Sequence, residues 1–372
     1  MRKSILVLAM IALVALFAIS CNSEPVHEHE YVEKHNDENH WKECECGEKI
    51  EVSKHVFSAW VVSEDGTVTR TCGCGYEETA TEKGISVATE DELNNAIENR
   101  LETIYLSKDI AVKNRFRIIE KKVSIDFNGY KITLDEKFTD KGDGPFGLIT
   151  IDNECELTLK DSSNGKGGID ATTVANDKVG SCIVIYPDPG HKAKLSIDGG
   201  IYNAPDFAVS GNGLCIDDGC TEIAISGGTF RAGTAIYHPQ NGIMKITDGT
   251  FIGTESAIEV RAGKVEIADG SFTSEADAFA CDENGNGTTT KGAAIAVAQH
   301  STQLAIDVSI KGGSYKGVKA LSNENPQNNP AEALKKVKLS VSGGKFSTDP
   351  SEFIPEGFKA EKSENNWIVS SK

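Results

Sequence analysis

One short motif returns six times in the second half of the chain and sets the period of the sequence. Each copy reads Ile or Val, any residue, Gly or Asp, Gly, any residue, and then Phe or Tyr. The copies end at Tyr202, Phe230, Phe251, Phe272, Tyr315 and Phe346. The intervals of 28, 21, 21, 43 and 31 residues indicate a unit of about 21, with one interval of two units and two lengthened by loops. A unit this short must stack on its neighbours to bury an apolar face.

A second set of positions follows the same period. Isoleucine recurs, each time after an apolar or small residue, at Ile149, Ile183, Ile216, Ile236, Ile258 and Ile295. Two positions later stand Ile151, Ile185, Asp218, His238, Val260 and Val297. Each unit therefore holds two short alternating strands, with one set of side chains inside and the next outside. The chain is predicted to be all-β, with like residues stacked in columns.

The repeat resembles the pectate-lyase-like superfamily of right-handed parallel β-helices from about residue 85 to residue 346. Leucine-rich repeats need a Leu/Asn signature that is absent, and a β-propeller needs about twice the period. The resemblance implies a right-handed parallel β-helix solenoid. The sequence Thr89-Glu90-Asp91-Glu92 is a capping box, which predicts a capping helix as far as about Asn99. Residues 353–367 are predicted to close the other end.

The N-terminus carries the features of a lipoprotein signal. Arg2 and Lys3 precede an apolar run over residues 5–19, which leads into Ser20-Cys21. A small residue before Cys at this point resembles the lipobox of bacterial lipoproteins. The resemblance implies a signal peptide of residues 1–20, acylation of Cys21 and attachment to a membrane through the lipid. The alternative is an ordinary signal peptide cut nearby. The expected location is the cell envelope, at the cell surface or the outer membrane.

Residues 21–84 form a small Cys/His-rich, zinc-ribbon-like module. The pairs Cys44-x-Cys46 and Cys72-x-Cys74 are each followed by Gly, which lets the backbone turn so that both sulfurs face one ion. The segment resembles short Cys/His modules of bacterial surface proteins. The ligands of a structural zinc are either Cys44, Cys46, Cys72 and Cys74, or His40, Cys44, Cys46 and His55. Disulfides are the alternative in an oxidising envelope. Asp65-Gly66 between β-branched runs predicts a β-hairpin that brings the pairs together.

The charge of the chain limits the class of partner. The formal net charge of −18 argues against nucleic acid, because a phosphate backbone is bound by clustered Lys and Arg. An acidic surface is compatible with neutral sugars, cations or protein partners. The oligomeric state is left open.

The outward-facing positions of the second strand column indicate a candidate ligand strip. Asp217, Tyr237 and Glu259 fall in neighbouring units. Aromatic faces stack on sugars and carboxylates accept hydrogen bonds from hydroxyl groups, so these residues are predicted to bind a polysaccharide. The alternative is a solvated face with no ligand.

Three polar residues in the same region form a candidate catalytic group. Asp218 and His238 occupy positions where the column otherwise holds Ile or Val, and Asp217 adjoins them. Adjacent carboxylates with a nearby His and Arg261 are similar to polygalacturonase-type glycosidases, which use two carboxylates as general acid and base. The Asn-Thr-Asp, Gly-His-Gly and Arg-Ile-Lys elements of that family are absent. A pectate-lyase mechanism is no better supported.

Two further patterns lie in the repeat region. Residues 282–287 match the first half of a calcium loop, with side-chain oxygens at alternate positions before a Gly turn. Ala293 stands where that loop needs Glu, which favours a turn between coils. Cys215 and Cys220 are a candidate disulfide outside the core.

The sequence thus predicts three parts: a signal peptide (residues 1–20), the Cys/His-rich module (21–84) and a β-helix with terminal caps (85–372). The leading hypothesis is a non-catalytic, adhesin-like lipoprotein whose β-helix binds a glycan or a surface protein. The alternatives are a polysaccharide-degrading glycosidase or lyase, and a spacer with no specific ligand. Fold alone does not decide among them.

Overall fold

The computed structural model describes residues 28–58, 60–63, 67–80, 84–99, 103–138, 147–163, 165–174 and 179–372. The predicted signal peptide, Cys21 and the turn residues Asp65 and Gly66 lie outside these ranges. The chain divides into an N-terminal unit, Met1–Ser58 with Arg70–Glu78, and a second unit, Ala59–Thr69 with Thr79–Lys372. Within the described residues, no helix is both long and apolar enough to cross a membrane.

The N-terminal unit is built on a three-stranded antiparallel sheet. Its strands are β1 (Tyr31–His35), β2 (Asn39–Cys44) and β3 (Lys49–Lys54), in that order. The register places Cys44 opposite Tyr31 at one end of β2 and His40 opposite His35 at the other. A second small sheet contains β4 (Val61–Val62), β5 (Val68–Thr71) and β6 (Glu77–Thr79). Strands β4 and β5 pair antiparallel, as the predicted hairpin requires.

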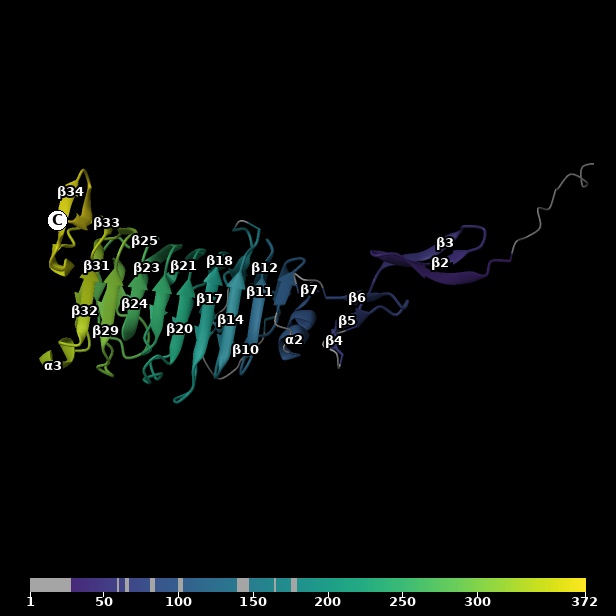
Figure 1. Cartoon of the computed structure of the whole chain (residues 1–372), viewed down its shortest axis with the longest axis horizontal. Coiled ribbons are helices and arrows are strands. Elements are labelled where there is room, and N and C mark those ends of the chain that lie inside the picture. Colours follow the sequence, from purple (N-terminus) through teal and green to yellow (C-terminus); the bar gives the residue numbers. More distant parts are fainter. Residues whose placement is uncertain are drawn as a thin grey trace, which may run out of the picture. The chain divides into compact units, whose positions relative to one another are not determined.

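The second unit, called here the β-stack, consists of parallel strands paired in long ladders (Figure 1). The first ladder is the ten-stranded sheet, and every strand in it pairs with the equivalent strand of the next repeat. Its members are β7 (Ile85–Val87), β8 (Thr103–Leu106), β11 (Lys122–Asp126), β14 (Cys155–Lys160), β17 (Ala193–Asp198), β20 (Thr221–Ile225), β22 (Ile243–Ile246), β24 (Gly263–Ile267), β29 (Ile306–Ile310) and β32 (Val337–Val341).

Two further ladders share the 17-stranded sheet, because β21 (Thr229–His238) and β23 (Thr250–Val260) belong to both. The second ladder also contains β9 (Ile110–Val112), β12 (Lys131–Leu134), β15 (Gly168–Asp170), β18 (Ile201–Asn203), β25 (Ser271–Ser274), β30 (Ser314–Lys316) and β33 (Gly344–Phe346). The third also contains β10 (Phe116–Ile118), β13 (Gly147–Ile151), β16 (Ser181–Ile185), β19 (Phe207–Gly211), β28 (Ala293–Ala298) and β31 (Lys319–Glu324).

The aromatic residue of every motif falls in one column of the second ladder. The backbone register pairs Tyr202, Phe230, Phe251, Phe272, Tyr315 and Phe346 in succession. Their rings are buried and stacked, with centroids 4.8–4.9 Å apart and planes within 8° of parallel. The register that the motif predicts is therefore confirmed.

The glycine at the fourth position of the motif makes the bend between the first and second ladders. Gly249 and Gly270 have φ values of +139° and +130°, which residues with a side chain rarely adopt. A Cβ atom on Gly249 would also lie 3.0 Å from the ring of Phe251. Gly249 thus permits the turn and leaves room for the ring of Phe251.

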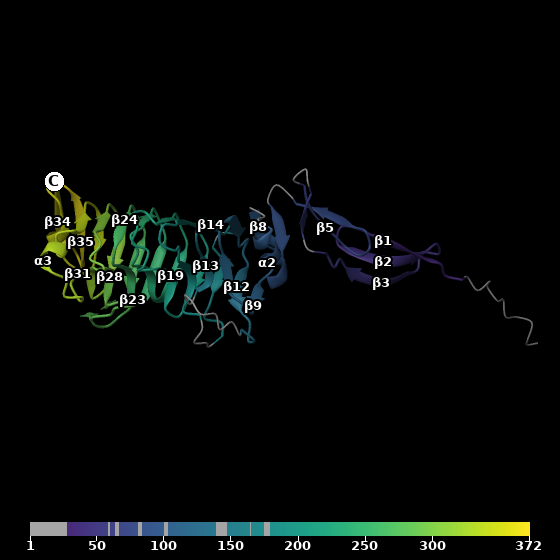
Figure 2. The same ribbon diagram turned by 90° about the horizontal axis from the view of Figure 1, so that it is seen from below.

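Both ends of the β-stack are covered (Figure 2). Helix α2 (Glu90–Glu98) begins at the predicted capping box: Thr89 Oγ1 accepts a hydrogen bond from the Glu92 backbone, and the Glu92 side chain accepts one from Ala88 N. Its apolar face, with Leu93 and Ile97, joins the core. The far end carries α3 (Ala331–Leu334), η1 (Ser351–Phe353), β34 (Phe358–Ser363) and β35 (Asn366–Ser371). Phe358 and Trp367 pack against the core, as the predicted C-terminal cap requires.

One position of the second predicted column is wrong. Val209, not Ile216, pairs between Ile183 and Ile236. Ile216 lies in a loop after β19 and is half exposed. The correct residue of this repeat was missed because Cys215-Ile216, in the loop, has the same local pattern of a small residue before an apolar one.

The described part of the chain is therefore all-β, with long parallel sheets stacked in register. This confirms the fold class at that level and is compatible with a β-helix.

Candidate functional sites

The N-terminal unit gathers four metal-binding side chains around its second Cys pair. The ligand atoms of His40, His55, Cys72 and Cys74 all lie within 4.8 Å of one another. His40 lies on strand β2, His55 directly follows the end of β3, and the two cysteines follow β5. Nδ1 of His40 lies 3.5 Å from the Cys72 sulfur, and Nδ1 of His55 lies 3.4 Å from the Cys74 sulfur.

The other ring nitrogen of each histidine is already occupied. Nε2 of His55 lies 2.7 Å from the backbone oxygen of Asn36, and Nε2 of His40 lies 2.9 Å from Ser53 Oγ. A carbonyl oxygen only accepts, so His55 Nε2 carries a proton and Nδ1 is the ring nitrogen that faces the sulfurs. Outer partners of this kind orient metal-ligating histidines. The donor set and its orientation fit a tetrahedral Zn²⁺ site.

The electrostatics of Cys72 also fit metal binding. Burial alone raises the pKa of this thiol, but hydrogen bonds from the Cys74 backbone and the His55 side chain outweigh burial and lower the pKa to about 6. The pKa of the neighbouring Cys74 thiol is raised by burial and by Cys72, so Cys72 is the member of the pair that loses its proton first. The thiolate is the form that binds a metal ion.

Neither predicted set of four ligands matches this grouping. The first set combined both Cys pairs, and the second joined His40 and His55 to Cys44 and Cys46. His40 and Cys44 lie four residues apart on one strand, a span of about 13 Å at 3.3 Å per residue. They cannot share an ion while β2 stays extended, so each end of β2 has its own cluster. The second cluster contains His29, Cys44 and Cys46; His29 was not among the predicted ligands.

The β-stack carries a separate candidate site, a groove of about 530 Å³ on the outer face of the third ladder. Strands β16, β19 and β21 form its floor. Phe207 and Tyr237 stack there with ring centroids 5.1 Å apart and planes 22° from parallel. Tyr186 also lines the groove, just beyond the end of β16.

Polar groups surround these rings. Ser181 Oγ and Ser210 Oγ lie 3.2 Å apart on the floor, and Asp206, Asn212 and Asn286 also line the groove. Burial raises the pKa of the Asp206 carboxyl. A concave surface with aromatic faces and a few polar groups is typical of a small-molecule or sugar site.

A loop over residues 282–289 forms one wall of the groove, between β26 (Ala280–Cys281) and β27 (Thr290–Lys291). Its backbone is held from below. The Gly287 oxygen accepts hydrogen bonds from Arg261 Nη1 (2.6 Å) and from the Tyr237 hydroxyl (3.0 Å). The Glu259 carboxylate accepts from Thr289 N at 2.8 Å and from Thr290 N at 2.9 Å.

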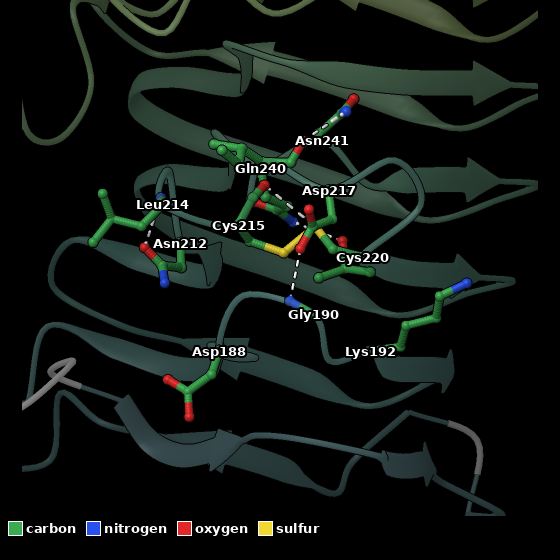
Figure 3. The surroundings of a disulfide bond; sticks show 12 residues. Asp188, Gly190, Lys192, Asn212, Leu214, Cys215, Asp217, Cys220, Gln240 and Asn241 are labelled. Carbon is green, nitrogen blue, oxygen red and sulfur yellow. Dashed lines mark hydrogen bonds between the residues drawn. A yellow bond between two sulfur atoms is a disulfide. The ribbon is translucent and has the colours of Figure 1, made fainter.

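The loop that follows β19 also contributes to the groove lining. Asn212 and Leu214 line the groove, and Leu214 is exposed. The predicted Cys215–Cys220 disulfide is present and closes this loop (Figure 3). Asp217 accepts a hydrogen bond from Gly190 N at 2.7 Å, which ties the loop to the preceding turn.

The residues predicted as a ligand strip do not form one. Tyr237 lines the groove, but Glu259 is fully buried beneath the 282–289 loop and Asp217 belongs to the disulfide loop. The strip depended on placing Asp217 in the rung before Tyr237, whereas Ser210 pairs there.

The predicted catalytic residues are likewise separated in register. His238 ends β21, is fully buried, and contacts Gln240 Nε2 through Nδ1 at 3.0 Å. Burial lowers its pKa to about 4, so the ring is neutral at physiological pH. In the rung before it, the position assigned to Asp218 belongs to Gly211, which pairs with Ile185. The stacked placement of Asp218 beside His238 was wrong for the same reason as Ile216.

The candidate calcium loop uses the side chain of Asn284 for hydrogen bonds within the loop. Asn284 Oδ1 accepts a hydrogen bond from Asn286 N, and Asn284 Nδ2 donates to Thr288 O. This is an Asx turn. The described residues contain two groups of side chains that could hold a metal ion, and both lie in the N-terminal unit.

Comparison with protein-family models, curated proteins and solved structures gave no match to this chain.

Proposed function

We propose that this chain is a lipid-anchored envelope protein whose right-handed parallel β-helix binds a glycan in the groove over β16, β19 and β21. The stacked pair Phe207 and Tyr237 on the floor of the groove is the observation that carries the proposal. The flat apolar face of a sugar packs on such rings while its hydroxyl groups reach the polar rim. Acylation of Cys21 and a location at the cell surface or outer membrane belong to the same proposal.

Binding rather than turnover is the activity that this geometry favours. Asp206 lines the groove, and no second carboxylate appears among the groove-lining residues that the structure describes. A glycosidase needs two carboxyl groups flanking the bond that it cleaves. A reducing-sugar and unsaturated-product assay over a polysaccharide panel measures turnover, and activity abolished by Asp206→Asn would favour the enzyme instead.

The groove is tested by replacing its aromatic floor. Phe207→Ala is expected to weaken binding on a glycan array at least tenfold, equivalent to about 1.4 kcal/mol, because the stacking face is lost. The matched control is Tyr130→Ala, a partly exposed aromatic residue outside the groove lining, which should leave affinity unchanged. Equal affinities for both variants, or no bound glycan with the wild-type chain, would contradict the proposal.

We also propose that His40, His55, Cys72 and Cys74 hold a structural zinc ion. Their role is to tie the second Cys pair to β2 and β3. In the described backbone these segments are otherwise connected by the Phe57–Cys72 bridge and by the hydrogen bond from Ser58 N to Thr71 O. A small unit with little core needs such a staple.

The zinc proposal predicts a change in metal content and in local order. In the reduced full-length protein, His55→Ala is expected to lower the metal content by one equivalent per chain and to speed amide hydrogen exchange over residues 70–78. His35→Ala is the control, since this histidine packs against Tyr76 but is not in the ligand group. Unchanged metal content in His55→Ala would refute the site.

A further inference from the structure

We infer that the first Cys pair holds a second metal ion, bound by His29, Cys44 and Cys46 with one coordination position left for an exchangeable ligand. This goes beyond the proposed glycan and structural-zinc functions, which leave these residues without a role. The three ligand atoms lie within 4.8 Å of one another.

The two Cys pairs have the same backbone structure. In the first, Cys44 N donates to Glu48 O at 2.9 Å and Gly47 N donates to Cys44 O at 2.8 Å. In the second, Cys72 N donates to Tyr76 O at 2.8 Å and Gly75 N donates to Cys72 O at 2.9 Å. Gly47 and Gly75 have φ values of +89° and +86°. The same turn, built twice, presents two sulfurs to one point in both places.

The distances to the histidines match metal coordination. Bond lengths of about 2.3 Å to sulfur and 2.05 Å to nitrogen place tetrahedral N and S ligands about 3.6 Å apart. Nδ1 of His29 lies 3.5 Å from the Cys46 sulfur, close to the 3.5 Å and 3.4 Å separations in the four-ligand cluster. The geometry of the first pair is thus that of the second with one histidine fewer.

The surroundings of the first cluster differ in a way that leaves a position open. Within the described residues the cluster offers three Cys and His ligands, and the carboxylate of Glu48 lies 3.0 Å from His29 Nδ1. The first cysteine of each pair is buried, but His29 and Cys46 are exposed, whereas the other ligands of the four-ligand cluster are only partly exposed. Three protein ligands plus an accessible fourth position characterise sites that exchange ligands. Glu48, water or a group from outside can take that position.

Metal content per chain tests the inference. Reduced full-length protein is loaded with Zn²⁺, desalted and analysed by elemental analysis, and two equivalents are expected. Cys46→Ser should reduce this to one. Glu45→Ala, an exposed residue between the two cysteines, is the matched control and should retain two. One equivalent in the wild-type chain that is unchanged by Cys46→Ser would overturn the second site.

Release kinetics provide an independent measurement. With a chromogenic chelator, zinc should leave the wild-type protein in two phases of equal amplitude, and Cys46→Ser should lose the fast phase. In His55→Ala the fast phase should remain and the slow phase should disappear. Failure of the second site removes only the fast phase, whereas failure of the proposed structural zinc removes only the slow one. A single phase lost only in His55→Ala would overturn the inference.

Discussion

Replacing Arg261 with alanine is expected to lower the free energy of unfolding by about 3–5 kcal/mol, because the Glu259 carboxylate then stays buried without its cation. Both side chains are fully buried, and Arg261 Nε lies 3.9 Å from Glu259 Oε1. Arg261 also donates to Gly287 O, so the wall of the groove loses a contact in the same variant. Urea denaturation measures the first effect and glycan affinity the second.

The matched control is Arg231→Ala. Arg231 pairs with Glu275, but about half of each side chain is exposed, and such pairs contribute at most about 1 kcal/mol. Equal losses for Arg231→Ala and Arg261→Ala would contradict the role of burial. The double change Glu259→Gln with Arg261→Met should recover most of the stability, since no charge remains buried.

The loss in Arg261→Ala should also depend on pH. Burial already raises the pKa of Glu259 in the wild-type chain, and Arg261 opposes that rise. Without Arg261 the folded-state pKa lies further above the unfolded value. The folded state then binds the proton more tightly, so the variant gains stability relative to wild type as the pH falls.

Phe251→Ala is expected to lower the free energy of unfolding by about 3–5 kcal/mol, the range for an aromatic side chain removed from a well-packed core. The Phe251 ring is fully buried and stacks between Phe230 and Phe272 with both centroid distances at 4.8 Å. The rungs above and below are fixed by their own backbone pairing and cannot close the gap.

Ile252→Ala is the control for the aromatic column. Ile252 follows Phe251 on β23 and is only partly buried. The substitution Ile252→Ala therefore removes a large apolar side chain from the other face of the same strand. Its loss should be clearly smaller than that of Phe251→Ala in the same urea denaturation. Similar values for the two variants would mean that the column is not the main source of stability.

The sequence predicted the aromatic column correctly because every copy of the motif contains two fixed markers, the glycine at the bend and the aromatic residue after it. Its Gly bend requires a positive φ, and the aromatic residue follows at a fixed distance, so loop length elsewhere does not disturb the register. The second column has no such marker. The prediction assigned Ile216 to the position that Val209 occupies, because a loop of variable length separates this strand from the equivalent strand of the next repeat.

The candidate sites depended on contacts that no local pattern reveals. The strand position of Glu259 is outward-facing, but the 282–289 loop folds over it and buries it completely. The residues that could hold a metal ion come from the predicted Cys/His-rich module, yet their grouping follows from the length of β2, which separates His40 from Cys44. The groove was found in part, through Tyr237, while Phe207 gave no signal in sequence.

The even spacing of the stacked rings has a consequence for how such a chain can change in length. Each rung contacts mainly the rungs beside it, and successive strands lie about 4.8 Å apart. Adding or deleting one whole repeat between α2 and the groove would shift the groove by one strand spacing and leave the contacts within every other rung intact. The position of the groove along the β-stack can therefore change in steps of one strand spacing, without any change in the residues that line the groove.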